Sequence, residues 1–223
     1  MLKKRGICFD LDGTLLNSVE GGQDRFLEVS QKLSLPVKPE TRKLAVSFWH
    51  NPTNILITSV WPDIDPQKFI DEWQKLDTTE LLPIIPDAIM TLRLLSEEFY
   101  LSILTNRPRQ STEFQIYHFR HLFDFVITPD DTLIKNDGKK CYKPDPRTME
   151  LVIQEYEKRG VKKNSIIFVG DTVSVDYELA RITNVSFYAV TSGGCSFKDF
   201  LAAGVRQERI ISSITELPRL LLY

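Results

Sequence analysis

Carboxylates follow two short apolar runs of the sequence, and these side chains have the clearest capacity for chemistry. Residues 6–9 lead directly into Asp10 and Asp12, and a later apolar run leads into Asp171, with Asp176 five positions further on. Short apolar runs that end in acidic residues and glycine are typical of buried strands. In an open parallel sheet, ligands bind beyond the carboxyl ends of the strands. We therefore expect these carboxylates to meet at one edge of a sheet.

A divalent cation would hold such a group of carboxylates together. Like charges in a cleft of low dielectric constant repel and raise one another's pKa. The candidate ligands are oxygen atoms, which favours Mg²⁺ over Zn²⁺. Lys143, in a loop, and Thr105, which follows the apolar run 101–104, could hold a phosphate from another side. This combination indicates phosphoryl transfer.

The elements that must position these residues alternate along the chain. Apolar runs predict six strands, and segments with apolar residues three or four positions apart predict helices between most of them. The predicted strands are 6–9, 101–104, 125–127, 166–169, 187–190 and 210–211, and the predicted helices are 87–99, 146–158, 175–183 and 197–203. This alternation predicts an α/β protein with a Rossmann-like parallel sheet covered on both faces.

One long stretch interrupts the alternation. From about residue 19 to 83 the pattern is helical: Phe26, Val29 and Leu33 share one face, and Asp65 with Pro66 marks a helix start. We expect residues 18–84 to form a small helical cap domain inserted after the first strand. Residues 1–17 and 85–223 would then form the catalytic core.

The polar groups, taken in order, resemble the four motifs of the haloacid dehalogenase (HAD) superfamily. These groups are residues 10–14 (DLDGT), Thr105, Lys143 with Pro144, and Gly170-Asp171 with Asp176. The resemblance spans residue 8 to about residue 190 of the chain. The helical insertion is similar to the mobile C1-type cap of the phosphoglycolate phosphatase-like branch. Residues 191–194 (TSGG) resemble the late glycine-rich loop of that branch.

The resemblance implies a mechanism for the two aspartates of the first motif. Asp10 would attack phosphorus to form an aspartyl-phosphate, and Asp12 would protonate the leaving alcohol and then activate water. Dehalogenases resemble this pattern but lack the second aspartate, because their reaction has no phosphate-ester leaving group to protonate. The presence of Asp12 therefore favours phosphate chemistry.

The resemblance also implies a metal site. The side chain of Asp10, the backbone carbonyl of Asp12 and Asp171 would hold Mg²⁺, with Asp176 as a ligand or an outer partner. Four residues separate Asp171 from Asp176, whereas many relatives have three. This departure leaves the duty of Asp176 open, and Ser174 is an alternative residue for the metal region.

Three further residues complete the expected site. By the same resemblance, Thr105 and Lys143 would bind the phosphoryl oxygens, and Asn106 would help through its amide. Lys143 has a competing interpretation as a solvated loop charge, because three more lysines lie nearby in the sequence. Aspartate and glycine after a strand are likewise common in turns for local reasons alone.

Other candidates are weaker. His118 and His121 lie three positions apart on an expected helix, but no third ligand stands beside them, so a helix surface is the better interpretation. Trp49 and His50, in the expected cap, could reach the substrate, although the cap core is the better interpretation of Trp49. Arg107 could contact a substrate carboxylate or lie at the mouth of the cleft.

Composition limits the partners. The chain has 223 residues, 42% of them hydrophobic and 26% charged, and a formal net charge of -2, so bulk charge gives no reason to expect nucleic acid or anionic membrane as a partner. The basic first residues lead into an apolar run too short for a signal peptide. Three scattered cysteines fit a reducing compartment. We expect a cytoplasmic protein and make no prediction of its oligomeric state.

The predicted function is Mg²⁺-dependent hydrolysis of a small phosphorylated metabolite, such as a phosphoglycolate-like acid or a sugar phosphate. Two alternatives stand beside it. A phosphomutase of the same superfamily would return the phosphoryl group to another hydroxyl, and release of free phosphate separates the two. A binding or regulatory protein on this scaffold would turn over poorly, although none of the expected site positions is lost.

Overall fold

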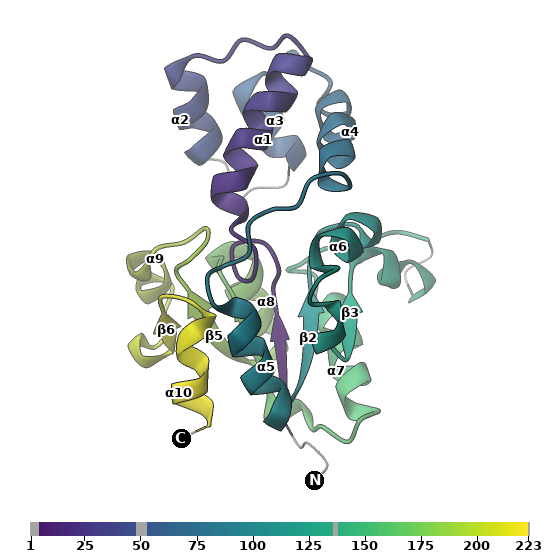
Figure 1. Cartoon of the computed structure of the whole chain (residues 1–223), viewed down its shortest axis with the longest axis vertical. Helices are drawn as coiled ribbons and strands as arrows, with labels where there is room; N and C mark the ends of the chain where they lie inside the picture. The colour runs from purple at the N-terminus through teal and green to yellow at the C-terminus, as the bar shows by residue number, and fades with distance from the viewer. Residues whose placement is uncertain (1–4, 48–52, 136–137, 223) are drawn as a thin grey trace.

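A six-stranded parallel sheet forms the centre of the computed structural model, which describes residues 5–47, 53–135 and 138–222 (Figure 1). The strand order is β3-β2-β1-β4-β5-β6, so β1 lies between β2 and β4. The strands are β1 (Arg5–Phe9), β2 (Phe99–Leu104), β3 (Phe125–Ile127), β4 (Ile166–Gly170), β5 (Ser186–Val190) and β6 (Ile210–Ile211). The six predicted strands and the α/β fold class are thereby confirmed.

Successive side chains of each strand pack alternately into two hydrophobic cores, one on each face of the sheet. In β1, Ile7 and Phe9 pack on one face of the sheet, while Cys8 between them packs on the other. The first face is covered by α5 (Ala88–Glu98) and α10 (Leu217–Leu221), and the second by α7 (Pro146–Glu157), α8 (Glu178–Thr183) and α9 (Phe197–Ala202). A sheet buried on both faces explains why its strands read as continuous apolar runs.

Shorter helical elements join these layers. Helix α6 (Arg109–Ile116) follows β2, whereas the sequence placed a helix only further along, at His118 and His121, because RQSTEFQI has few apolar residues. The 3-10 helices are η1 (Arg120–Leu122), η2 (Pro129–Lys135), η3 (Lys163–Ser165), η5 (Gln207–Arg209) and η6 (Ile214–Glu216), and η4 (Val173–Tyr177) is a π-helical turn. The single predicted helix 175–183 is thus divided between η4 and α8.

The two histidines do not share a helix face. Helix α6 ends at Ile116, so His118 lies in the following turn and His121 lies in η1, and both are exposed. The helix has to end there because the chain turns back toward the sheet, with Phe119 and Phe123 buried against each other at 6.1 Å between ring centroids. The placement of both histidines on one helix was therefore wrong.

Among the described residues between β1 and α5, four helices bury an apolar cluster of their own. They are α1 (Ser18–Lys32), α2 (Pro39–Ser47), α3 (Thr53–Val60) and α4 (Pro66–Asp77). Phe26 stacks on Trp61 at 5.2 Å between ring centroids, and Phe69 lies 5.4 Å from Phe26. Helix α4 starts as predicted, since Asp65 accepts a hydrogen bond from the backbone N–H of Gln67. Trp49 and His50 lie outside the described residues.

The chain enters and leaves this helical segment at neighbouring points. Leu16 and Ile84 form an antiparallel bridge, and the N–H of Asn17 donates to the carbonyl of Pro83 at 2.7 Å. Figure 1 shows α1 to α4 above the ends toward which the strand arrows point, while both termini lie at the opposite end. The helices therefore stand over the carboxyl ends of the parallel strands.

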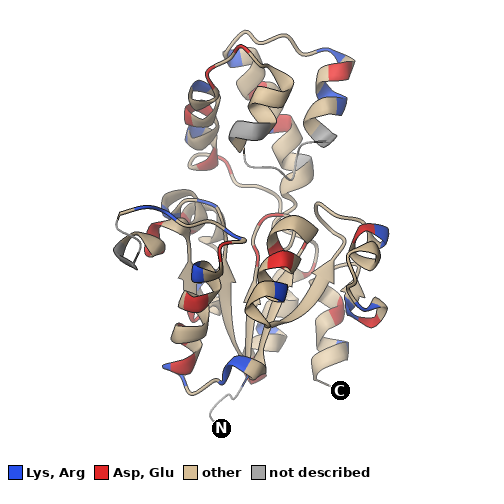
Figure 2. Ribbon diagram, turned by 180° about the vertical axis from the view of Figure 1, so that it is seen from behind, with Lys and Arg blue, Asp and Glu red and all other residues tan. Residues whose placement is uncertain are grey.

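Charges are distributed over both parts of the molecule. In Figure 2, basic and acidic positions alternate along the helices of the upper and the lower part. Helices long and apolar enough to cross a membrane do not occur in the described part of the chain.

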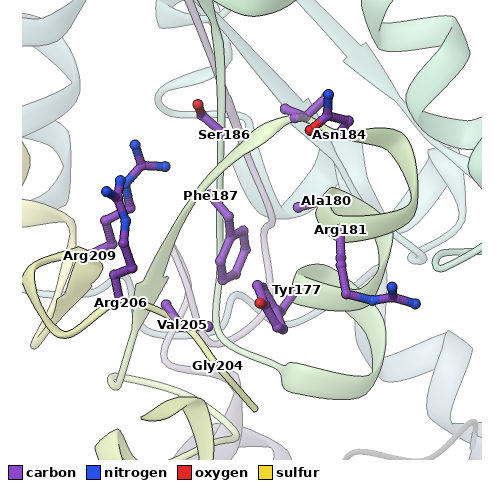
Figure 3. A pocket seen from close by; sticks show the side chains of 11 residues that line it. Tyr177, Ala180, Arg181, Asn184, Ser186, Phe187, Gly204, Val205, Arg206 and Arg209 are labelled. Atoms are coloured by element: carbon purple, nitrogen blue, oxygen red, sulfur yellow. The ribbon is translucent and has the colours of Figure 1, made fainter.

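A surface hollow of about 340 Å³ lies at the opposite end of the strands from the helical segment (Figure 3). Its walls come from α8, from the start of β5 and from the segment that precedes β6. Tyr177 and Phe187 lie at its centre, and Arg206 with Arg209 stands at one side. This hollow contains none of the residues that the sequence nominated for chemistry.

Replacement of Phe69 by alanine tests the independence of the helical cluster. Phe69 is fully buried, so its truncation should lower the local stability of α1 and α4 by about 3–5 kcal/mol. Amide hydrogen exchange measures this loss helix by helix, and Met90→Ala, at a side chain that is 64% exposed, is the control. Equal loss of protection in β1 and β4 would show that helices and sheet unfold as one unit.

Candidate active site

Polar residues follow three neighbouring strands at the carboxyl edge of the sheet. Asp10 follows β1, and its N–H still donates to the carbonyl of Val169 on β4 at 2.8 Å. Thr105 follows β2 and continues the ladder to Ile127 with an N–H···O bond of 3.1 Å. Asp171 follows β4. The strand register therefore brings these three positions to the same edge, as expected from the sequence.

Three buried carboxylates cluster there around one ammonium group. An oxygen from each of Asp10, Asp171 and Asp176 lies within 4.8 Å of the others. The Nζ of Lys143 donates to Asp10 Oδ1 at 2.5 Å and to Asp176 Oδ1 at 2.7 Å. All four side chains are almost completely buried. Lys143 is therefore part of the site, whereas Lys140 in the same loop pairs with Asp130 at 2.6 Å.

The single ammonium group does not balance the charge of the three carboxylates. Burial raises the pKa of Asp10 to about 7, with Lys143 opposing this rise and Asp176 adding to it. Burial, followed by the charges of Asp176 and Asp10, raises the pKa of Asp171 well above its ordinary value. Burial alone would lower the pKa of Lys143, but its two carboxylate partners raise it. Three carboxylates and one ammonium leave two negative charges, and an all-oxygen donor set of that charge fits a hard divalent cation.

Glycines allow Asp171 to come this close to the first motif. Gly13 has a φ of +77°, and a Cβ atom on it would lie 2.3 Å from Asp171 Oδ2. A Cβ atom on Gly193 would lie 2.1 Å from the same oxygen. The N–H of Gly194 donates to Asp171 Oδ2 at 2.6 Å. The loop 191–194 thus contacts a site carboxylate, whereas the sequence showed only that this loop resembles one of the family.

The π-helical turn η4 accounts for the unusual interval between Asp171 and Asp176. A π turn contains one residue more than an α turn, and such insertions are frequent at functional sites. It returns Asp176 to the cluster, where Oδ2 accepts from the Thr172 hydroxyl at 2.7 Å and from the N–H groups of Asp171 and Thr172. Ser174 is exposed on the same turn. The geometry therefore favours Asp176 over Ser174 as the residue near a metal. The Oδ2 atom of Asp176 already accepts three hydrogen bonds.

Asn106 contacts the backbone of Lys143. Its Nδ2 donates to the carbonyl of Lys143 at 3.1 Å, and the N–H of Lys143 donates to its Oδ1 at 2.6 Å. Both ends of the amide are therefore used to fix the loop that carries the ammonium group. The expected contact between the Asn106 amide and a phosphate stays a prediction. Thr105 is buried beside it, and its hydroxyl accepts from the N–H of Arg107 at 3.1 Å.

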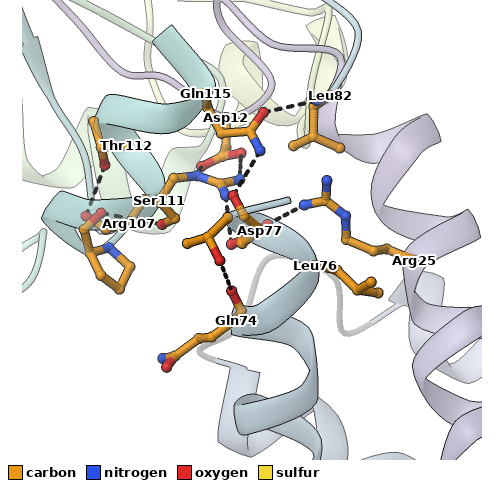
Figure 4. A network of polar contacts seen from close by, with 12 residues as sticks. Asp12, Arg25, Gln74, Leu76, Asp77, Leu82, Arg107, Ser111, Thr112 and Gln115 are labelled. Atoms are coloured by element: carbon orange, nitrogen blue, oxygen red, sulfur yellow. Dashed lines mark hydrogen bonds and ion pairs between the residues drawn. The ribbon is translucent and has the colours of Figure 1, made fainter. Parts of the chain in front are cut away.

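Asp12 lies apart from the buried cluster, in a polar network of its own (Figure 4). Its carboxyl group accepts two hydrogen bonds from Arg107, from Nη2 at 2.6 Å and from Nε at 3.1 Å. Unlike the other site aspartates it is partly open, with 34% of its side chain exposed. The sequence nominated Asp12 and noted Arg107, but it gave no indication that the two are paired, because 95 positions separate them.

The fold and this edge of carboxylates define an α/β protein with an acidic cluster that could hold a metal ion. Comparison with known proteins identifies the family. The model of the haloacid dehalogenase-like hydrolase family matches residues 7–190. The chain therefore belongs to that family.

Relatives and solved structures agree with this assignment. The phosphoglycolate phosphatase of Aliivibrio fischeri is 26% identical over 208 residues, which is 84% of each chain. A haloacid dehalogenase-like hydrolase from Streptococcus pneumoniae superposes with a TM-score of 0.76 at 19% identity, covering 99% of both chains. A structure described as a predicted phosphoglycolate phosphatase, from Haemophilus somnus, gives a TM-score of 0.75 at 19% identity and covers 99% of this chain and 98% of its own. At these identities the two structures show the shared fold.

Thermal unfolding with and without Mg²⁺ tests the charge deficit. The folded-state pKa of Asp10 is about 7 against an ordinary 3.8, so the folded chain binds more protons than the unfolded chain between these values. Its contribution to stability therefore falls as pH rises through this window. A cation that binds the ionised carboxylates should raise the unfolding temperature by roughly 5–10 °C at a concentration about one hundred times its Kd.

This shift should be larger at about pH 8 than at about pH 5, because protons compete with the cation for the carboxylates. Asp171→Asn should abolish most of it. A shift of equal size at both pH values, or one that survives in Asp171→Asn, would contradict a metal site at this cluster.

Proposed function

We propose that this HAD phosphatase hydrolyses a small phosphate monoester with Mg²⁺ as its cofactor, by way of an aspartyl-phosphate on Asp10. One observation carries the proposal: Asp10 directly follows the central strand β1, and its Oδ1 lies 2.5 Å from the Nζ of Lys143, inside a buried carboxylate cluster that could hold a divalent cation. A carboxylate in this position can be ionised and still be approached by an anionic phosphate, because the Lys143 ammonium group and a bound Mg²⁺ would offset the repulsion.

Asp10 and Lys143 have distinct duties in the proposed first step. An oxygen of Asp10 attacks phosphorus while Lys143, with the hydroxyl of Thr105, binds phosphoryl oxygens. Asp10 and Asp171 would hold the metal together with the backbone carbonyl of Asp12, with Asp176 beside them. Bound Mg²⁺ would supply positive charge to the carboxylates and to the transferring phosphoryl group. Asn106 keeps Lys143 in place by fixing its backbone.

Asp12 is the proposed acid and base. It donates a proton to the leaving alcohol oxygen in the first step, and in the second it accepts a proton from the water that hydrolyses the aspartyl-phosphate. Its partial exposure suits this duty, because the group that exchanges protons with alcohol and water must reach both. The buried carboxylates suit the metal instead.

The division of the chain into domains is part of this proposal. Residues 1–17 and 85–223 would form the catalytic core, and residues 18–84 a cap that closes over the substrate and excludes water. The separate apolar cluster of α1 to α4 and the adjacent crossings at Leu16 and Ile84 support this division.

The names of the relatives support a proposal for the substrate class. Several matched proteins are named phosphoglycolate phosphatase, at 24–26% identity. We therefore propose a small phosphorylated metabolite, with a phosphoglycolate-like acid or a sugar phosphate as the classes to screen first. The three cysteines are free thiols, which agrees with the proposed cytoplasmic location.

Phosphate release from a nitrophenyl phosphate, with and without Mg²⁺, tests the function. Asp10→Asn should lower the rate by a factor on the order of 10³ or more, because it removes the nucleophile. With an alkyl phosphate as the substrate, Asp12→Asn should lower the rate of phosphate release by a factor of about 10²–10⁴. Glu97→Gln, at an exposed carboxyl group on α5, is the matched control and should leave the rate unchanged.

The outcome also separates the reaction classes. Mg²⁺-dependent release of free phosphate that disappears in Asp10→Asn supports the hydrolase. Transfer of phosphate to a second alcohol without release would indicate a mutase. No turnover of the aryl ester or of a panel of small metabolite phosphates by folded protein would reject the phosphatase proposal.

A further inference from the structure

A chain of ion pairs connects the helical segment to the partly exposed Asp12 (Figure 4). Arg107, which follows β2, contacts Asp12 with Nε and Nη2 and lies with Nη1 2.6 Å from Asp77 Oδ2. Asp77 is the last residue of α4, and its other oxygen pairs with Arg25 of α1. One guanidinium therefore joins a carboxylate of the proposed catalytic core to a carboxylate of the proposed cap.

The middle of this chain is buried. Asp77 is 5% exposed, Arg25 3% and Arg107 9%. Burial would lower the pKa of Arg107, but Asp12 and Asp77 raise it above its ordinary range. Charges this far from water are favourable only when they are paired, so the absence of one partner would leave the next without compensation.

Further hydrogen bonds fix the cap side of the network. Arg25 donates to the carbonyl of Glu80 at 2.7 Å. The Nε2 of Gln115, on α6 of the core, donates to the carbonyl of Asp77 at 3.0 Å and to that of Glu80 at 2.7 Å. Its Oε1 accepts from the N–H of Leu82 at 2.8 Å. These hydrogen bonds therefore hold the backbone of Asp77 in place against α6.

Asp12 depends on this network for its orientation. In the described part of the chain, the donors to its carboxyl group are Nε and Nη2 of Arg107. Arg107 can present both nitrogens to Asp12 while its third nitrogen faces Asp77, because the guanidinium is a rigid planar fork. Movement of α4 away from the sheet edge would remove Asp77 and release one side of that fork.

We propose that Asp77 and Arg107 are positioning residues for the acid-base step. Asp77 orients Arg107, and Arg107 holds the carboxyl group of Asp12 in the direction of the leaving group. The inference rests on the proposed phosphatase function and on the role of Asp12 in it. It adds that a residue of the cap sets the orientation of the core's acid, so proton transfer is efficient when the helices are docked over the site.

The dependence of rate on the leaving group tests this inference. An alkyl phosphate needs a proton on its leaving oxygen, whereas nitrophenolate leaves without one. The ratio kcat/KM covers the steps up to alcohol release, so hydrolysis of the aspartyl-phosphate does not enter it. Asp77→Asn and Arg107→Met should each lower kcat/KM for phosphoglycolate or glycerol phosphate about tenfold, and that for nitrophenyl phosphate less than about twofold.

A double variant separates positioning from general damage. If Asp77 acts through Arg107, adding Asp77→Asn to Arg107→Met should cause no further change in the ratio of the two kcat/KM values. Asp71→Asn, at an exposed carboxyl group on the same helix α4, is the matched control and should leave kcat/KM for both substrates unchanged. Circular dichroism and thermal unfolding confirm that each variant is folded.

Arg107→Lys provides a second route if Asp77→Asn does not fold. A lysine cannot hold both oxygens of Asp12 and face Asp77 at once, so the same selective loss is expected. Equal losses with both substrates, no loss, additive effects in the double variant, or a faster alkyl reaction would each overturn the inference. If the wild-type protein itself releases no phosphate, the proposed function fails instead, and the two failures are thereby distinguished.

Discussion

The site is organised around one electrostatic constraint, which is that three buried carboxylates lie in one cluster with an ammonium group that contacts two of them. Asp10, Asp171 and Asp176 cannot all be ionised beside Lys143 alone without a large cost in free energy. The strand ends bring the carboxylates together, and the amide of Asn106 fixes the lysine among them. Several features that appear independent in the sequence therefore serve one charge balance, which a bound cation would complete.

Space and hydrogen bonding meet the same constraint. A side chain on Gly13 or Gly193 would collide with the carboxyl group of Asp171. The N–H of Gly194 donates a hydrogen bond to that carboxyl group. The π-helical turn gives Asp176 its approach to the cluster. Asp12 stands outside this arrangement, partly exposed and held by an arginine. The site thus separates carboxylates suited to a metal from a carboxylate suited to proton exchange.

The strands and the edge they share could be predicted because a sheet buried on both faces produces continuous apolar runs. Helix α6 could not, since its face toward the core is mostly polar, and Gln115 there binds the backbone of Asp77 and Glu80. The backbone contact of Asn106 and the pairing of Arg107 with Asp12 and Asp77 depend on residues distant in sequence. Local patterns carry no information about such contacts. Asp77 accordingly looked like any other acidic residue at a helix end.

The adjacent crossings at Leu16–Ile84 and Asn17–Pro83 have an evolutionary consequence. Because the chain leaves the sheet and returns to it at almost the same place, the segment between them can vary in length or sequence while the strand order and the carboxylate edge persist. Substrate preference and reaction chemistry can then diverge at different rates. The ion pair between Asp77 and Arg107 limits this freedom, since an exchanged segment would have to supply an equivalent carboxylate.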